Sequence, residues 1–271
     1  MSDDRYPLSA SQIKTHEWCA LQYWFQYLSE YETYTEENEY LKLGNLVHDT
    51  IESALPNDFS NVSLDMLERR FEAVMQDQVN RMGLDRSDDD DAEIIEKAQK
   101  QLNVAARYIR KRCHKRDQHA DDGEDDSPVQ ITDVEKWIEF APNRPDLSYP
   151  MRAKIDIVSQ ADGEIWDWKT GSIRDNWIQA TLYYAAFTAE YGFEPNKVIF
   201  VHLGEREVVI EEPQREDWEK LVAKANEVIE AKENDYFPAT GAKDDKCYHC
   251  DWEPHCPETD VGVSQFAWED Y

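Results

Sequence analysis

An Asp-Gly pair at positions 162 and 163 separates two apolar runs, and it restricts the fold more strongly than any other feature of the sequence. An Asp-Gly dipeptide between two runs of strand-forming residues is the strongest short signal for a β-hairpin. The runs here are Ile155 to Val158 and Glu164 to Trp168. The sequence therefore predicts two adjacent antiparallel strands, and with them a fold that contains a sheet.

The predicted hairpin brings together two carboxylates and a lysine. With Asp162 and Gly163 as the two central turn residues, Asp156 lies opposite Lys169, and Asp167 lies two residues before Lys169 on the same strand. Residues that are directly opposite, or two apart on one strand, share a face of the sheet. Two aligned carboxylates can hold Mg²⁺ or Mn²⁺, and a lysine beside them can stabilise charge on a phosphate. The alternative is an exposed hairpin with charged side chains, and a one-residue change in the turn would separate the three groups.

Two further motifs flank the hairpin. Gly44 and His48 lie four residues apart in a segment predicted to be helical and stopped by Pro56. After the hairpin, Gln179 and Tyr183 are four residues apart in a second helix-like run, so they share one face of that helix.

In this order the motifs resemble the RecB-like branch of the PD-(D/E)XK nucleases, which includes AddB-type and CRISPR-associated RecB-like exonucleases. The resemblance consists of a Gly-x-x-x-His helix, an Asp on one strand, Asp-x-Lys-Thr-Gly on the next and a Gln-x-x-x-Tyr helix, between residues 8 and 257. The family usually has a glycine three residues before the first Asp, where this chain has Ala153. Alanine is still small enough to let the strand lie close to a substrate.

The resemblance implies an α/β fold with a restriction-endonuclease-like mixed sheet flanked by helices and an N-terminal helical part. It also implies metal-assisted hydrolysis of phosphodiester bonds. Asp156 and Asp167 would bind one or two ions of Mg²⁺ or Mn²⁺, with His48 and the carbonyl of Trp168 as further ligands. Lys169 would orient the nucleophile or stabilise the charge of the transition state.

Gln179 and Tyr183 would position the substrate strand or the catalytic lysine. Each assignment has a structural alternative. His48 could be a core histidine, and Gln179 and Tyr183 could simply pack their helix on the sheet. Glu135, on the strand before Asp156, is either an additional acid near the ligands or an exposed edge residue.

The cysteines indicate a second metal centre. Three of them form a Cys-x2-Cys-x5-Cys pattern near the C-terminus, and close spacing without a signal peptide indicates a metal rather than disulfides. Zinc is one interpretation, with His249 or His255 completing the site. The chain has five cysteines: Cys19, Cys113, Cys247, Cys250 and Cys256.

The family resemblance implies a [4Fe–4S] cluster instead, with one cysteine before the nuclease core and three after it. Cys19 matches the N-terminal cysteine, and Cys247, Cys250 and Cys256 match the other three. We favour this interpretation over zinc. The cluster would join the two chain ends across the fold. Cys113 is left over, and we expect it to be a buried or bystander thiol.

The order of predicted elements is typical of one α/β domain over residues 1–271, with helices first and a sheet later. We divide it into a mainly helical part (1–128), a sheet core with the catalytic motifs (129–235) and a cysteine-rich tail (236–271). Helices are predicted at 9–29, 40–55, 63–82, 92–116, 177–191 and 214–234. Strands are predicted at 129–140, 150–159, 163–169, 197–203 and 206–211.

The charge balance conflicts with a nucleic-acid partner. The chain has 58 acidic and 29 basic residues, a net charge of −29, and should repel DNA at ordinary salt. Either the partner is not nucleic acid, or the acidity is an adaptation to molar salt, where the Debye length is about 3 Å. The acids are spread from end to end, so we favour an extreme halophile or its virus as the source. A dense basic cluster either grips a strand or complements a helix dipole; its residues are Arg107, Arg110, Lys111, Arg112, Lys115 and Arg116.

The family resemblance implies a metal-dependent DNA exonuclease, acting on single strands in repair and recombination, viral replication or CRISPR spacer acquisition. No Gly-x-x-x-x-Gly-Lys-Ser/Thr loop is present, so a helicase or CRISPR integrase would be a separate partner. The alternatives are a catalytically silent iron–sulfur adaptor that binds DNA ends, and a zinc-stabilised hydrolase of another phosphate ester. The absence of a signal peptide and of a long apolar run predicts a cytoplasmic protein without membrane contact.

Overall fold

The computed structural model describes residues 7–31, 38–55, 63–113, 128–142, 147, 149–240, 247 and 250–257. Five helices precede the first strand in this part of the chain: α1 (Ala10–Trp18), α2 (Ala20–Tyr27), α3 (Glu39–Ala54), α4 (Leu64–Met82) and α5 (Asp89–Cys113). The strands are β1 (Asp133–Phe140), β2 (Met151–Ser159), β3 (Glu164–Lys169), β4 (Lys197–His202) and β5 (Glu207–Glu211). Helix α6 (Trp177–Tyr191) connects β3 to β4, and α7 (Arg215–Glu233) follows β5.

The five strands form one mixed sheet in chain order, β1-β2-β3-β4-β5. The pairs β1–β2, β2–β3 and β4–β5 are antiparallel, whereas β3 and β4 are parallel. A parallel pair needs a long crossover connection, and α6 supplies it. The prediction of an α/β fold with a helix-flanked mixed sheet is confirmed.

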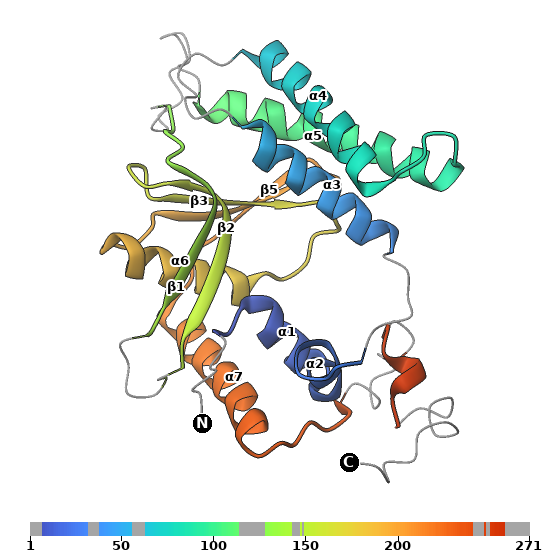
Figure 1. The fold of residues 1–271 in the computed structure, drawn as a ribbon. Coiled ribbons are helices and arrows are strands. Elements are labelled where there is room, and N and C mark those ends of the chain that lie inside the picture. Colours follow the sequence, from blue (N-terminus) through green and yellow to red (C-terminus); the bar gives the residue numbers. More distant parts are fainter. Residues whose placement is uncertain are drawn as a thin grey trace.

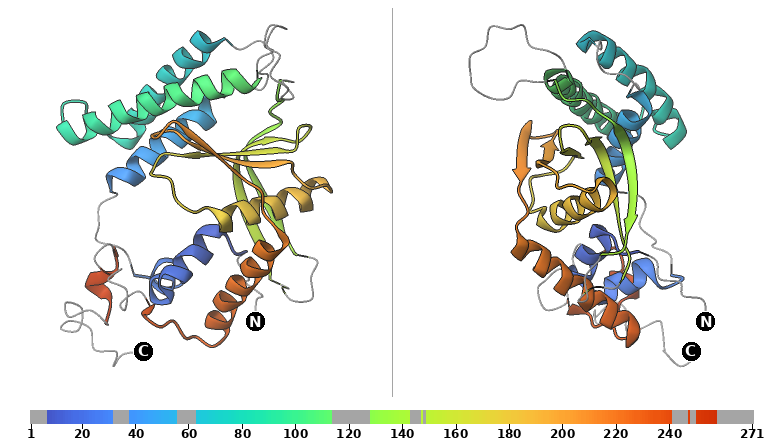
Figure 2. Two further views of the ribbon diagram at one scale, coloured as in Figure 1. Left: turned by 180° about the vertical axis from the view of Figure 1, so that it is seen from behind. Right: turned by 90° about the vertical axis from the view of Figure 1, so that its left-hand side faces the viewer.

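Helices cover both faces of the sheet (Figures 1 and 2). Helices α3, α4 and α5 pack on one face, in a core that includes Ile157, Trp166 and Trp168. Helices α1, α6 and α7 pack on the other face, in a core that includes Ile155 and Ile165. We refer to these two sets as the α3–α5 layer and the α1–α6–α7 layer.

Strands β1 and β2 both depart from regular strand geometry at the same level of the sheet. On β2, Ile155 packs toward the α1–α6–α7 layer, but Ile157, two residues on, packs toward the α3–α5 layer. On β1, Glu135 has a φ of 52°, in the left-handed region that non-glycine residues rarely adopt. Its neighbours Val134 and Lys136 pair with Ile157 and Ile155, which places Glu135 beside Asp156. The sheet is therefore irregular at the level of the first predicted acidic residue.

The predicted hairpin exists, but its register differs by two residues. Ser159 pairs with Glu164, and the connection between them has four residues rather than two. The carboxylate of Asp162 accepts hydrogen bonds from Ser159 Oγ (2.5 Å) and from the backbone N–H of Gln130 (2.9 Å), so it anchors the loop to the chain before β1. Gly163 has a φ of 62°, and a Cβ there would lie 3.0 Å from the backbone nitrogen of Asn196, which precedes β4.

Two helix boundaries also differ from prediction. The helix expected over 9–29 is interrupted at Cys19, whose extended backbone (φ −160°, ψ 119°) ends α1 and begins α2. Helix α5 begins earlier than expected, at Asp89, because acidic side chains in its first turn complement the helix dipole. Cys113 at its end is buried, as expected for a bystander thiol.

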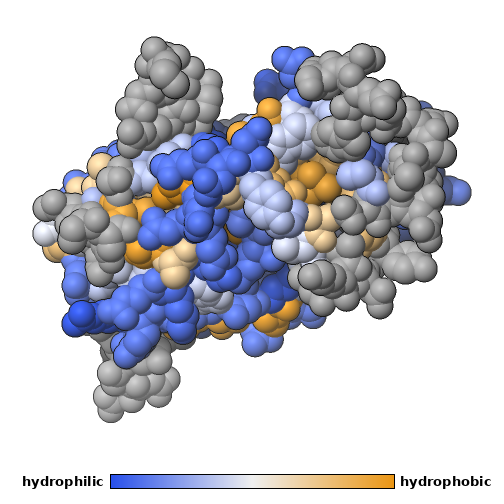
Figure 3. All heavy atoms as spheres, turned by 90° about the horizontal axis from the view of Figure 1, so that it is seen from below, coloured by the Kyte–Doolittle hydropathy of each residue, from blue (hydrophilic) through white to orange (hydrophobic). Residues whose placement is uncertain are grey.

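One side of the molecule has a mainly hydrophilic surface. Seen from the side on which α7 lies, most of the described surface is hydrophilic and its hydrophobic side chains form separate patches (Figure 3). Within the basic cluster, Arg112 has a structural role. Its guanidinium lies 2.6 Å from the buried carboxylate of Glu164 on β3 and forms an ion pair with it. Lys115 and Arg116 lie outside the described residues. None of the described helices is long and apolar enough to cross a membrane.

Candidate active site

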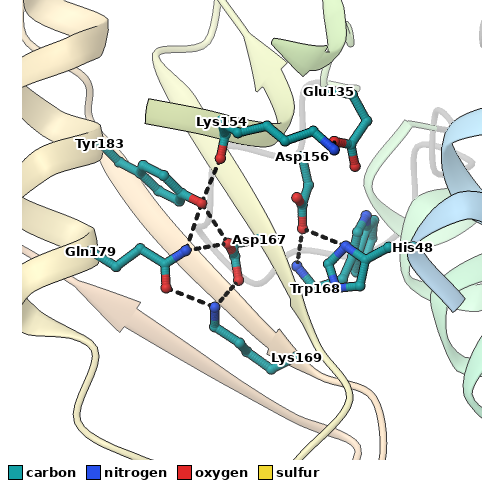
Figure 4. Close-up of polar contacts among 9 residues, drawn as sticks. All are labelled: His48, Glu135, Lys154, Asp156, Asp167, Trp168, Lys169, Gln179 and Tyr183. Carbon is teal, nitrogen blue, oxygen red and sulfur yellow. Dashed lines mark hydrogen bonds and ion pairs between the residues drawn. The ribbon is translucent and has the colours of Figure 1, made fainter. Parts of the chain in front are cut away.

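The candidate site lies where β2 and β3 separate beyond their last paired residues, Ile157 and Trp166. Both helix layers contribute to it: α3 supplies His48, and α6 supplies Gln179 and Tyr183 (Figure 4). The contacts form two groups, one around Asp156 on β2 and one around Asp167 on β3.

Around Asp156, three potential ligands for a cation converge. One ligand atom from each of His48, Glu135 and Asp156 lies within 4.8 Å of the others. His48 Nδ1 is 3.4 Å from Asp156 Oδ2, which also accepts a 2.7 Å hydrogen bond from the backbone N–H of Trp168. Glu135 is ion-paired with Lys154 of β2.

Around Asp167, a closed network holds the catalytic lysine candidate. Lys169 Nζ lies 2.5 Å from Asp167 Oδ1 and donates to Gln179 Oε1 at 2.8 Å. The Gln179 amide donates to Asp167 Oδ2 (2.9 Å) and to the Tyr183 hydroxyl (2.6 Å). The Tyr183 oxygen is also 2.8 Å from Asp167 Oδ2 and from the Lys154 carbonyl, which ties α6 to both β2 and β3.

The electrostatic environment separates the two aspartates. Burial opposes ionisation of Asp156, but His48, the Trp168 N–H and Lys169 outweigh it and lower the pKa. Burial, and then the charge of Asp156, raise the pKa of Asp167 against the opposing effect of Lys169. Both carboxylates are almost inaccessible to solvent, so each depends on these neighbours for its charge.

Two other groups titrate in an unusual range. Burial lowers the pKa of His48, but the neighbouring Asp156 outweighs it, and the net effect raises this pKa to about 9. Burial and the charge of Asp156 raise the pKa of Glu135 to about 7. In the metal-free protein, His48 is therefore protonated at neutral pH, and a cation that binds there displaces the proton.

The predicted site residues come together, although not as a single face of a hairpin. Asp167 and Lys169 face α6 as expected, whereas Asp156 turns toward His48 of α3. The N–H of Trp168 is in the network, and the role of its carbonyl as a ligand stays a prediction. Glu135 was not among the expected ligands, and the signal that would identify it is its pairing position beside Asp156.

The four cysteines of the predicted cluster also converge. Cys19, at the junction of α1 and α2, and Cys250 pack against a small core of Leu21, Phe25, Trp252 and Cys256. Burial raises the pKa of Cys250 to about 11, and the thiols of Cys19, Cys256 and Cys247 add to the shift. The aromatic rings of Phe25 and Trp252 stack with centroids 5.4 Å apart.

The tail and the N-terminal helices are also connected through the backbone. The Leu21 N–H donates to the Pro238 carbonyl (3.2 Å), and the Ala20 N–H donates to Thr240 Oγ1 (3.3 Å). His255 packs against Tyr31, with ring centroids 5.6 Å apart. His249, the other histidine considered for a zinc site, lies outside the described residues.

Comparison with known proteins agrees with the geometry. The model of the PD-(D/E)XK nuclease superfamily matches residues 7–257. No curated protein matches the chain. The matched region spans α1 to the last cysteine and includes every residue of both contact groups. The chain therefore belongs to the PD-(D/E)XK nuclease superfamily.

Proposed function

We propose that this protein is a divalent-metal-dependent DNA exonuclease that hydrolyses phosphodiester bonds of single strands. The observation that carries the proposal is the pair of contact groups at the separation of β2 and β3. One group offers ligands for a cation, and the other holds a lysine beside a second carboxylate. Membership of a nuclease superfamily supports the same chemistry.

The donor set fits a hard divalent cation. His48, Glu135 and Asp156 offer one nitrogen and carboxylate oxygens, which suit Mg²⁺ or Mn²⁺. Oδ1 of Asp167 is close to Lys169 but lacks a partner with hydrogen-bond geometry. Its lone pairs can therefore also bind a cation. When bound, the ion supplies a more acidic water and neutralises charge on the phosphate.

The chain's own residues do the remaining work. Lys169 is held by Asp167 and Gln179 so that its ammonium points into the site, where it can orient the attacking water or stabilise the charge on the phosphate. Tyr183 fixes Gln179, and through it the position of the lysine. Because Asp167 and Tyr183 are buried and the lysine is bonded to this network, the lysine is placed before the substrate arrives.

The acidity of the chain sets the conditions of action. A net charge of −29 repels DNA at low salt, whereas at about 1 M salt the Debye length of about 3 Å leaves close contacts to dominate. We propose that the protein works at molar salt, as in an extreme halophile or its virus. Close contacts and bridging by the cation then replace long-range attraction.

We also propose that Cys19, Cys247, Cys250 and Cys256 hold a [4Fe–4S] cluster. The convergence of these thiols, from the two ends of the described chain, supports it. The cluster would join the 236–271 tail to the helices of a single domain.

The pathway is proposed from the resemblance to RecB-like nucleases. The candidate pathways are repair and recombination, viral replication and the trimming of CRISPR spacers. A helicase or integrase would be a separate partner.

The experiment is degradation of end-labelled single-stranded DNA in molar KCl with Mn²⁺. We expect the wild type to shorten the DNA, and label on each end in turn gives the direction. Lys169→Ala should abolish cleavage, whereas Lys197→Ala, an exposed lysine at the start of β4, should leave it unchanged. Intact DNA with the wild type at every salt concentration, together with retained DNA binding, would replace the nuclease by an adaptor that binds DNA ends.

The cluster has its own test. Anaerobically purified wild type should be brown and contain iron and acid-labile sulfide in equal amounts. Cys250→Ser should lose both, whereas Cys113→Ser, at a buried thiol near the end of α5, should keep both. Zinc at one atom per chain, without iron, would contradict the proposal.

A further inference from the structure

A pocket lies beside the candidate active site, between α1 and the beginning of α6. Its volume is about 460 Å³, within the range of about 300 to 1,000 Å³ typical of ligand pockets. The two helices pack against each other in the layer that also holds Gln179 and Tyr183. The pocket is lined by Lys14, Glu17, Trp18, Asp175, Trp177 and Ile178.

Lys14 places this pocket next to the catalytic groups. The charges of both Lys169 and Asp167 act on its ammonium, and burial together with Lys169 lowers its pKa. Lys14 is half-buried, and among the described residues no carboxylate forms an ion pair with it. A cation at the edge of an active site in a chain of net charge −29 is a specific place for a phosphate.

Two tryptophans give the pocket an aromatic wall. Trp18 lies one helical turn after Lys14 on α1, and 44% of its surface is exposed. Trp177 begins α6 on the opposite side of the pocket. Trp177 is partly buried, and Lys220 Nζ lies over its ring, 6.0 Å from the centroid. An exposed aromatic ring beside a cation is the arrangement with which proteins bind unpaired nucleotides, because every base has a face that can stack.

We propose that this pocket binds the nucleotide adjacent to the scissile phosphate of a single strand, with the base against Trp18 and Trp177 and the phosphate on Lys14. This inference rests on the proposed function. Glu17 lies 3.7 Å from Lys224 Nζ, and Asp175 accepts a 3.1 Å hydrogen bond from the Trp177 N–H. Their carboxylates repel phosphates from the rest of the pocket, and their remaining lone pairs can accept hydrogen bonds from N–H groups of a base. A base in a duplex is stacked on both faces by its neighbours, so the pocket selects single strands.

The test is binding of a fluorescein-labelled oligothymidylate, followed by anisotropy in EDTA so that no cleavage occurs. Stacking is worth about 1–3 kcal/mol per base, so Trp18→Ala should weaken binding about 5- to 150-fold. Trp18→Phe should restore most of the affinity. Lys14→Ala should weaken binding and reduce the slope of log affinity against log salt by about 0.7. Binding of the single strand should also quench tryptophan fluorescence in the wild type and less so in Trp18→Ala.

Matched controls separate the pocket from general effects. Trp137→Ala removes a tryptophan that is 57% exposed on β1, and Lys100→Ala removes an exposed lysine of α5; neither should change binding. Iron content and circular dichroism check that each Trp18 variant keeps the native fold, since Cys19 is its neighbour.

Three results would overturn the inference: a folded Trp18→Ala that binds the single strand as tightly as the wild type, equal weakening by Trp137→Ala, or wild type that does not bind single strands. If these results come from a protein that cleaves DNA in a Lys169-dependent manner, the proposal for the pocket is wrong and the proposed nuclease activity is retained. If Trp18→Ala loses binding as expected while the wild type cleaves nothing, the proposed nuclease activity is wrong and the proposal for the pocket is retained.

Discussion

Binding of a divalent cation should release protons from this protein, because the candidate ligands carry them at neutral pH. The pKa of His48 is raised to about 9, so about nine-tenths of this side chain is protonated at pH 8. The pKa of Glu135 is about 7, so this group adds about half a proton at pH 7 and little at pH 8. Release of about 1.5 protons at pH 7 and about one at pH 8 is therefore expected.

The same shift predicts how pH affects stability and affinity. Since the folded pKa of His48 lies above the ordinary value of 6.5, the charged His48–Asp156 pair stabilises the metal-free protein fully below pH 6.5. This contribution is lost as the pH rises through about 9. Because the cation competes with a proton, its affinity should increase about tenfold per pH unit between pH 7.5 and 8.5.

Isothermal titration calorimetry with Mn²⁺, in buffers of different ionisation enthalpy, measures the number of protons released. His48→Asn should lower this number by about one at pH 8. His16→Asn, on α1, should not change it, because burial lowers the pKa of His16 and leaves this side chain neutral. Stoichiometric Mn²⁺ binding without proton release at pH 8 would refute the assignment of His48 as a displaced, protonated ligand.

Three substitutions test the surrounding structure. Tyr183→Phe removes a buried hydroxyl that bridges three partners, so the free energy of unfolding in urea should fall by about 1–3 kcal/mol and cleavage should slow. Gly163→Ala adds a close contact to a left-handed residue and should cost about 1–2 kcal/mol more than Gly83→Ala, where φ is also positive but space is open; equal costs would show that the contact relaxes freely. Arg112→Met leaves the Glu164 carboxylate buried with one fewer partner and should destabilise by about 3 kcal/mol in thermal unfolding, and an unchanged melting temperature would contradict the ion pair.

The sheet and the motifs of the candidate site were predictable because they depend on local patterns. The Asp162-Gly163 pair between two apolar runs indicated the hairpin, and the i, i+4 spacing of Gln179 and Tyr183 placed them on one helix face. The two-residue error in register did not affect Asp167 and Lys169, because residues two apart on one strand share a face whatever the pairing. The four-residue loop was not predictable, because it depends on the contact of Asp162 with the distant Gln130.

The orientation of Asp156 and the role of Glu135 depend on three-dimensional packing. The strand irregularity at these two residues involves a left-handed backbone on a non-glycine residue, which no propensity indicates. His48 reaches Asp156 because α3 packs across the sheet, and that packing involves residues far apart in sequence. The break at Cys19 is similar, because helix propensity alone favours a continuous helix there.

The two contact groups of the site receive their helix residues from opposite faces of the sheet. His48 belongs to the α3–α5 layer, whereas Gln179 and Tyr183 belong to the α1–α6–α7 layer. A loosening of one layer would therefore disable one half of the chemistry while the other half stays assembled. Loss of cation affinity with an intact lysine network, or the reverse, would report which side of the molecule has opened.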